Sequence, residues 1–132
     1  MSLGKIHGFV PIAIAPGRTA DFVAGARACH EAALPDLTGT LAYEWYLSDD
    51  GTQAYVIEIY DDPAAVAHHS RMMDGRVAGL RDMASFRILF GGDVPDALQD
   101  RMRSVLGEVS HAGPRAFGRL EGPTPHRQPP AG

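Results

Sequence analysis

The sequence has a single cysteine, no excess of positive charge and no long apolar run, and each of these absences argues against a class of protein. Cys29 is the single cysteine, so no internal disulfide can form. The formal net charge of −4 gives no electrostatic reason to expect nucleic acid. The N-terminal apolar run is broken at His7, Gly8 and Pro11, which makes it too short for a membrane span or a secretory signal. We therefore expect a cytoplasmic protein with neither nucleic acid nor membrane as a partner.

Motifs for metal and cofactor binding are missing as well. No Cys-x-x-Cys pair is present for zinc, and there is neither a glycine-rich phosphate loop with its lysine nor a Gly-x-Ser-x-Gly turn. His68 and His69 are adjacent, so on a helix they point in different directions and are poor joint metal ligands. A site assembled in three dimensions from His7, His30 and His69 with a glutamate is the alternative. We predict no metal site and no bound cofactor.

The length of 132 residues is that of one domain, and 45% apolar with 21% charged residues is ordinary for a globular protein. Residues 121–132 contain four prolines and no apolar residue larger than alanine, a composition typical of disorder. We predict one domain over residues 1–120 and a proline-rich disordered tail over residues 121–132.

Apolar periodicity and turn residues divide the domain into strands and helices. Strands are predicted over residues 5–15, 40–48, 52–60 and 84–90. Helices are predicted over residues 19–35 and 62–80 and, after Pro95, through residues 98–105, followed by an extended arm over residues 108–120. This order predicts an α+β fold, the ferredoxin-like βαββαβ arrangement with an antiparallel sheet, extended by a C-terminal helix and arm.

The two long predicted helices each have a start signal and one buried face. Thr19 is the predicted N-cap of the first helix, and Asp62 followed by Pro63 starts the second. The buried face of the first helix is predicted to consist of Phe22, Ala26, Cys29 and Ala33. The inward stripe of the second is predicted to consist of Val66, His69, Met73, Val77 and Leu80, with a break near Gly75 or Gly79.

Residues 49–51, Asp-Asp-Gly, are typical of a three-residue hairpin loop between the second and third strands. With Ser48 opposite Thr52, Trp45 would lie opposite Tyr55. This register puts Tyr43 and Trp45 on one face of the sheet, and Glu44, Tyr46, Glu58 and Tyr60 on the other. We expect the glutamate-bearing face to meet His69.

The first strand has apolar residues on both faces, with Ile12 and Ile14 on one side and Phe9 and Ala13 on the other. Pro11 cannot donate a ladder hydrogen bond, so an irregularity is expected there. The helices of this fold cover one face of the sheet, and a large exposed apolar face is unfavourable in a monomer. We therefore predict a homodimer in which two sheets pack face to face.

Several short motifs occur in a fixed order along the chain. They are Tyr43-Glu44-Trp45, Asp50-Gly51, Glu58-x-Tyr60 with Asp62, Ala65 and His69, then Ile88 to Gly92, Gly107 and Gly113-Pro114. Over residues 5–120 this pattern resembles the antibiotic biosynthesis monooxygenase (ABM) superfamily. The resemblance implies a dimeric α+β barrel with a cavity between helices and sheet, where characterised members oxygenate phenols or quinols without metal or flavin.

The absence of asparagine limits what the resemblance implies. Another branch of the superfamily degrades heme, but its Asn/Trp/His set cannot be complete here. The asparagine that some phenol-oxidising members use is missing too.

Three residues are candidates for catalysis: His69, Glu58 and Glu44. His69 is the candidate base, because an imidazole titrates near neutral pH and this one is expected to face the cavity. The alternative is a core histidine hydrogen-bonded to Glu58 or Tyr60. Each glutamate either orients His69, raises its basicity or binds a substrate hydroxyl, or else pairs with an arginine such as Arg87.

A small aromatic ligand would be bound by aromatic and methionine side chains. The candidates are Tyr43, Trp45, Tyr46, Tyr60, Met73 and Phe86. The alternative for these side chains is a plain core or a dimer interface.

Three functions are open at this point. The leading hypothesis is cofactor-independent oxygenation of a small phenol or quinol, and the second is a non-catalytic ligand-binding or structural dimer of the same fold. An isomerase or decarboxylase is the third. The cavity separates the first two hypotheses: a hydrogen bond between His69 and Glu58, with no pocket of a few hundred Å³ beside them, would contradict the enzyme hypothesis.

Overall fold

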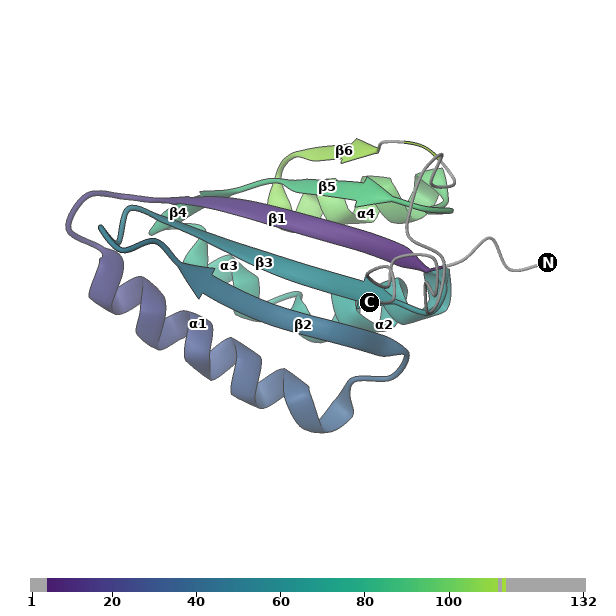
Figure 1. Cartoon of the computed structure of the whole chain (residues 1–132), viewed down its shortest axis with the longest axis horizontal. Helices are drawn as coiled ribbons and strands as arrows, with labels where there is room; N and C mark the ends of the chain where they lie inside the picture. The colour runs from purple at the N-terminus through teal and green to yellow at the C-terminus, as the bar shows by residue number, and fades with distance from the viewer. Residues whose placement is uncertain (1–4, 112, 114–132) are drawn as a thin grey trace, which may run out of the picture.

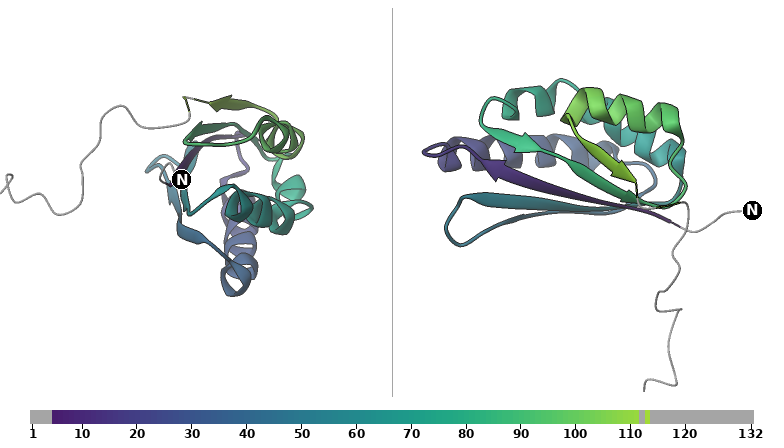
Figure 2. Two further views of the ribbon diagram at one scale, coloured as in Figure 1. Left: turned by 90° about the vertical axis from the view of Figure 1, so that its right-hand side faces the viewer. Right: turned by 90° about the horizontal axis from the view of Figure 1, so that it is seen from above.

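One sheet with its helices on a single side is the architecture of the computed structural model, which describes residues 5–111 and 113 (Figure 1). The strands are β1 (Ile6–Ile14), β2 (Thr40–Leu47), β3 (Gln53–Tyr60), β4 (Ala84–Phe86), β5 (Ile88–Gly91) and β6 (Val109–His111). The helices are α1 (Thr19–Ala33), α2 (Pro63–Met73), α3 (Arg76–Leu80) and α4 (Asp96–Leu106), with a 3-10 turn η1 (Leu34–Asp36) after α1. Figure 2 shows the helices against one face of the sheet, which leaves the other face uncovered.

The strand β1 lies in the middle of the sheet. The order across the sheet is β2-β3-β1-β5-β6, and β4 also pairs with β1. All of these pairs are antiparallel except β5 with β6, which is parallel. The order confirms the predicted ferredoxin-like βαββαβ fold, with β4 and β5 in place of the single strand predicted over residues 84–90.

Arg87 separates β4 from β5 at the position where β1 carries Pro11. Because Pro11 has no N–H, it cannot donate a hydrogen bond to this side of the ladder. The Arg87 N–H still donates to the Pro11 carbonyl, at 3.3 Å. The irregularity expected at Pro11 is therefore found in its partner strand, while β1 continues without a break.

The buried faces predicted for the helices are confirmed, but one of the two caps is wrong. Asp62 caps α2, since its Oδ1 accepts a hydrogen bond from the Ala65 N–H at 2.9 Å. Thr19 is instead the first residue of α1, and Arg18 takes the N-cap position. The Thr19 hydroxyl donates to the Gly51 carbonyl at 2.7 Å, which ties the start of α1 to the β2–β3 loop.

The register predicted for the β2–β3 hairpin is wrong by one residue. Ser48 pairs with Gln53, its N–H donating to the Gln53 carbonyl at 2.8 Å, so the loop has four residues, 49–52. Tyr46 consequently lies opposite Tyr55, and Tyr43 opposite Glu58. The Asp50 carboxylate keeps Thr52 in the loop by accepting hydrogen bonds from its backbone N–H and its hydroxyl.

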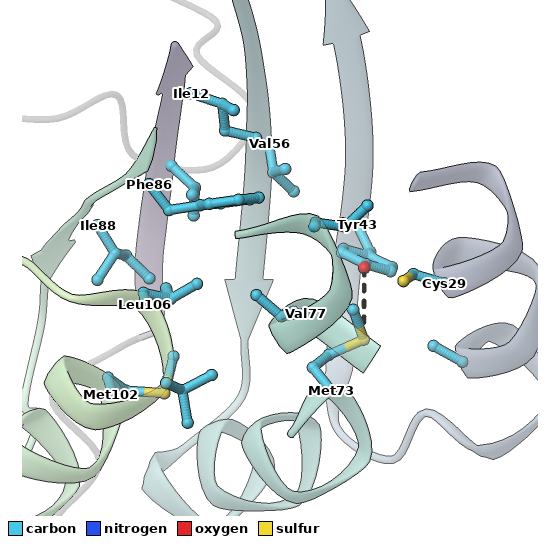
Figure 3. Close-up of a cluster of buried hydrophobic side chains, with 14 of the residues drawn as sticks. Ile12, Cys29, Tyr43, Val56, Met73, Val77, Phe86, Ile88, Met102 and Leu106 are labelled. Atoms are coloured by element: carbon cyan, nitrogen blue, oxygen red, sulfur yellow. Dashed lines mark hydrogen bonds between the residues drawn. The ribbon is translucent and has the colours of Figure 1, made fainter. Parts of the chain in front are cut away.

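The two faces of the sheet differ in their surroundings. The covered face packs against the helices and forms the core, part of which is drawn in Figure 3. The uncovered face, which we call the open face, carries partly exposed Phe9, Tyr46, Tyr55 and Leu89. The predicted tail over residues 121–132 and the end of the arm lie outside the described residues.

Substituting Gly51 tests the packing of the loop against α1. Gly51 has φ of 72°, and a Cβ atom there would lie 2.9 Å from Thr19 Cγ2. Gly17 has φ of 76° but no atom of the described residues within 4 Å of such a Cβ. Left-handed backbone costs a residue other than glycine about 1–2 kcal/mol. We expect both Gly17→Ala and Gly51→Ala to lower the free energy of unfolding in urea, Gly51→Ala by more. Equal losses would contradict the packing.

Candidate functional site

His69 projects from α2 onto the covered face of the sheet, where it meets residues of β2 and β3. Its Nε2 atom lies 3.7 Å from Glu58 Oε1, and the two side chains are 4% and 8% exposed. The Tyr60 hydroxyl donates a hydrogen bond to the other Glu58 oxygen. The ring of Tyr43 packs edge-on against the imidazole, with centroids 4.7 Å apart. The four residues form a buried polar cluster inside an apolar core.

Burial sets the protonation of this cluster. It lowers the pKa of the His69 imidazole, although the Glu58 charge acts in the opposite direction. Burial, followed by the Glu58 charge, raises the pKa of the Tyr60 phenol and that of the Tyr43 phenol. At neutral pH the imidazole is therefore neutral and able to accept a proton, while both tyrosines keep theirs.

One nitrogen of His69 is available for chemistry. Nδ1 is buried and has no hydrogen-bond partner among residues 5–111 and 113. Nε2 is too far from Glu58 for a hydrogen bond, but near enough for the carboxylate to stabilise an imidazolium. The arrangement can therefore take up a proton and hold the resulting charge.

The cavity beside this cluster is small. It has a volume of about 30 Å³ and is lined by Tyr43, Trp45, Glu58 and His69, among other residues. Such a volume is about that of one water molecule. Met73 also lines the cavity, and the Tyr43 hydroxyl points at its sulfur at 3.7 Å (Figure 3). Within the described residues, the cavity beside His69 is thus about ten times smaller than a pocket of a few hundred Å³, while His69 and Glu58, 3.7 Å apart, are not hydrogen-bonded. Only one half of the condition that would contradict an enzyme is therefore met.

The corrected register changes which predicted residues meet His69. Tyr43 and Trp45 lie on the covered face together with Glu58, contrary to the prediction. Glu44 and Tyr46 lie on the open face, where the Tyr46 hydroxyl donates to Glu44 Oε1 at 2.6 Å.

The other three residues predicted to bind a ligand lie at or beside the cluster. Tyr60 belongs to the cluster and packs edge-on against His69, while Met73 and Phe86 line the small cavity. Among the ion pairs of the described residues, none joins Glu58 or Glu44 to an arginine. The predicted alternative of arginine pairing is therefore not found in this part of the chain.

The sequence analysis considered His30 of α1 only as a possible metal ligand and did not predict its contact with Tyr43. Its ring stacks on Tyr43 with centroids 5.0 Å apart, and its Nε2 lies 3.2 Å from the Tyr43 carbonyl oxygen. It also lines a second cavity of about 300 Å³ between α1 and β2. The spacing of four residues from buried Ala26 could have identified it, since that spacing puts both on one side of the helix.

Two negative findings concern the described residues alone. Residues 5–111 and 113 contain no group of three or more histidine, cysteine, aspartate or glutamate side chains that could hold a metal ion. Within the same part of the chain, no helix has the length and apolar character that crossing a membrane requires.

Comparison with known proteins identifies the family. Residues 9–74, half of the chain, match the family described as antibiotic biosynthesis monooxygenase (ABM). The chain belongs to this family, as its motifs suggested. None of the curated proteins matches the sequence significantly.

Solved structures share the fold at low sequence identity. MupZ from Pseudomonas fluorescens is 20% identical with a TM-score of 0.63, over 88% of this chain and 95% of that one. PA3566 from Pseudomonas aeruginosa is 22% identical with a TM-score of 0.58, over 67% and 92%. A mutant of SnoaB, a cofactor-independent oxygenase from Streptomyces nogalater, is 11% identical with a TM-score of 0.56, over 66% and 90%.

Acid is expected to destabilise the protein through His69. Its pKa is lower in the folded state than in the unfolded state. The unfolded chain therefore binds more protons below about pH 6.5, and stability falls as the pH drops through that value. We expect the melting temperature to decrease less between about pH 8 and about pH 5.5 in His69→Gln than in the wild type. The same decrease in both proteins would contradict a depressed pKa.

Proposed function

We propose that this chain is a cofactor-independent monooxygenase that oxidises a small phenol or quinol, with His69 as the base. The observation that carries the proposal is a buried, neutral imidazole beside the Glu58 carboxylate in a member of the ABM family. A base with these properties is what proton removal from a phenol requires at neutral pH. The fold shared with the cofactor-independent oxygenase SnoaB is consistent with this class of reaction.

The proposed reaction starts when the phenolic proton moves to the available nitrogen of His69. The phenolate transfers one electron to dioxygen, and the resulting superoxide and substrate radical join through a new C–O bond at a ring carbon. The imidazolium returns its proton to the distal oxygen of the peroxide. The O–O bond then breaks, the hydrogen of that ring carbon leaves with the distal oxygen as water, and the proximal oxygen remains as a quinone carbonyl. For a phenol with a free para position, phenol and dioxygen give quinone and water. The substrate supplies all the electrons.

The neighbours of His69 have separate roles in this proposal. The Glu58 carboxylate stabilises the imidazolium that forms, and the Tyr60 hydroxyl holds Glu58 in place. Tyr43 fixes the plane of the imidazole by packing against it edge-on. Glu44 and Tyr46 have no part in the site, because they lie on the open face.

The small cavity must enlarge before a phenol can reach His69. Met73 and Met102 line it, and methionine side chains are flexible enough to change rotamer within a core. The backbone between α2 and α3 is also interrupted, at residues 74–75. The proposed substrate therefore enters by displacing side chains at the edge of the cavity.

A non-catalytic dimer of the same fold is the second candidate. The cavity of about 30 Å³ at His69 favours this candidate, since the cavity is too small to hold a phenol without rearrangement. In that case the cluster would only stabilise the core.

Oxygen uptake separates the two candidates. With a panel of hydroquinones, we expect the wild type to consume dioxygen and His69→Ala to lose at least about 100-fold in rate, as for removal of a general base. His68→Ala is the matched control, because His68 points instead to the Asp36 carbonyl, with Nε2 at 2.6 Å. Circular dichroism verifies that each variant is folded. Equal rates for His69→Ala and wild type would remove His69 from the mechanism.

We also propose a homodimer formed through the open face. Phe9 and Tyr46 on this face are 43% and 45% exposed, and Tyr55 and Leu89 are 38% and 39% exposed. Phe9 packs on Tyr55, and Tyr55 stacks on Tyr46, so the patch is continuous. Burying such a patch against a second copy removes apolar surface from water.

A charge on the open face is expected to break the dimer. We expect the wild type to have the mass of a dimer by light scattering at about 10 μM and Phe9→Glu to be a monomer, because a buried unpaired carboxylate is unfavourable. Leu34→Glu is the control, since Leu34 is 50% exposed on η1, away from the sheet. A wild type that is monomeric at micromolar concentration would refute the dimer.

A further inference from the structure

The larger of the two cavities near Trp45 lies between α1 and β2, and we call it the outer groove. It is lined by residues of three elements, among them Phe22, Ala26 and His30 of α1, Trp45 and Leu47 of β2, and Ala54 of β3. Its volume of about 300 Å³ is that of a small-molecule site. The inner cavity at His69 is about ten times smaller, at about 30 Å³.

The polar groups of the outer groove match a phenol. The Tyr43 carbonyl can only accept, so His30 donates to it through Nε2, and in the tautomer that carries its hydrogen on Nε2 the Nδ1 atom is an acceptor. An acceptor of this kind can bind a phenolic hydroxyl. Arg27 and Glu31 also line the groove with opposite charges, and within the described residues neither forms an ion pair. Their charges cancel, which suits an uncharged ligand.

Trp45 is the single described residue that lines both cavities. Its indole N–H is buried and has no hydrogen-bond partner among residues 5–111 and 113. On the inner side Trp45 packs edge-on against Tyr43, with centroids 6.1 Å apart, and Tyr43 in turn contacts His69. Trp45 therefore lies between the outer groove and the cavity at His69.

We propose that the outer groove is the docking site for the planar ring of a one-ring or two-ring phenol, and that Trp45 separates the docked ring from His69. His30 receives the phenolic hydroxyl, and the indole of Trp45 packs on the ring face. The inference rests on the proposed function for the reaction that follows docking. The docking itself is measured by binding, without turnover.

The test is a titration with 1-naphthol followed by tryptophan fluorescence. Trp45 is the only tryptophan of the chain, so the signal reports on this position alone. We expect saturable quenching in the wild type and at least tenfold weaker binding in Ala26→Leu, which extends a buried side chain into the groove. Ala24→Leu is the matched control, because Ala24 lies on the same helix and does not line the groove, and it should bind as the wild type does.

Two further variants are measured in the same titration. Val23→Phe fills the groove from a neighbouring, half-buried position and replaces Ala26→Leu if that variant does not fold. Val56→Ile fills the inner cavity, so it should bind 1-naphthol normally. Unchanged binding in a folded groove variant, or no saturable quenching of the wild type, would overturn the docking site. Normal binding without oxygen uptake from any hydroquinone would instead refute the proposed reaction and leave the docking site standing.

Discussion

The pairing of β2 with β3 determines which side chains reach the interior, because a shift of one residue would move every side chain of β2 to the opposite face. Asp50 fixes this pairing. Its carboxylate accepts hydrogen bonds from the Thr52 N–H, the Thr52 hydroxyl and the Ser48 hydroxyl, and these bonds lower its pKa. The carboxylate is therefore ionised at neutral pH and keeps Thr52 in the loop. As a consequence, Tyr43 faces the core opposite Glu58.

The interior that results contains a carboxylate, and a buried unpaired carboxylate costs several kcal/mol. Glu58 is 6% exposed. It accepts a hydrogen bond from Tyr60 on the same strand, and His69 lies within ion-pair distance. Because α2 begins at the Asp62 cap, two residues after β3 ends, the helical phase that brings His69 over Glu58 is set locally. The cap, the strand and the cluster thus form one connected unit.

Local signals in the sequence were sufficient to predict the main helices and strands, the antiparallel sheet and the inward direction of His69. They were not sufficient for the hairpin register. Asp49-Asp50-Gly51 fits both a three-residue and a four-residue loop, and the choice depends on side-chain hydrogen bonds to Asp50 that no periodicity reveals. The wrong register placed Glu44 beside His69 and Tyr43 away from it. The contact of His30 with Tyr43 was not predicted, because it depends on the distance between α1 and β2, a tertiary property.

The ring nitrogens of His69 provide the argument that favours a base over a structural core histidine. A structural histidine would have hydrogen bonds at its ring nitrogens, since a buried polar atom without a partner costs about 1–3 kcal/mol. Nε2 is 3.7 Å from the nearest carboxylate oxygen, and Nδ1 has no partner within the described residues. An apolar side chain in this position would avoid that cost. A polar atom kept in such an unfavourable position is typical of a site whose partner is a substrate. Under the proposed function, the small volume beside His69 is that of a cavity whose side chains pack together in the absence of substrate.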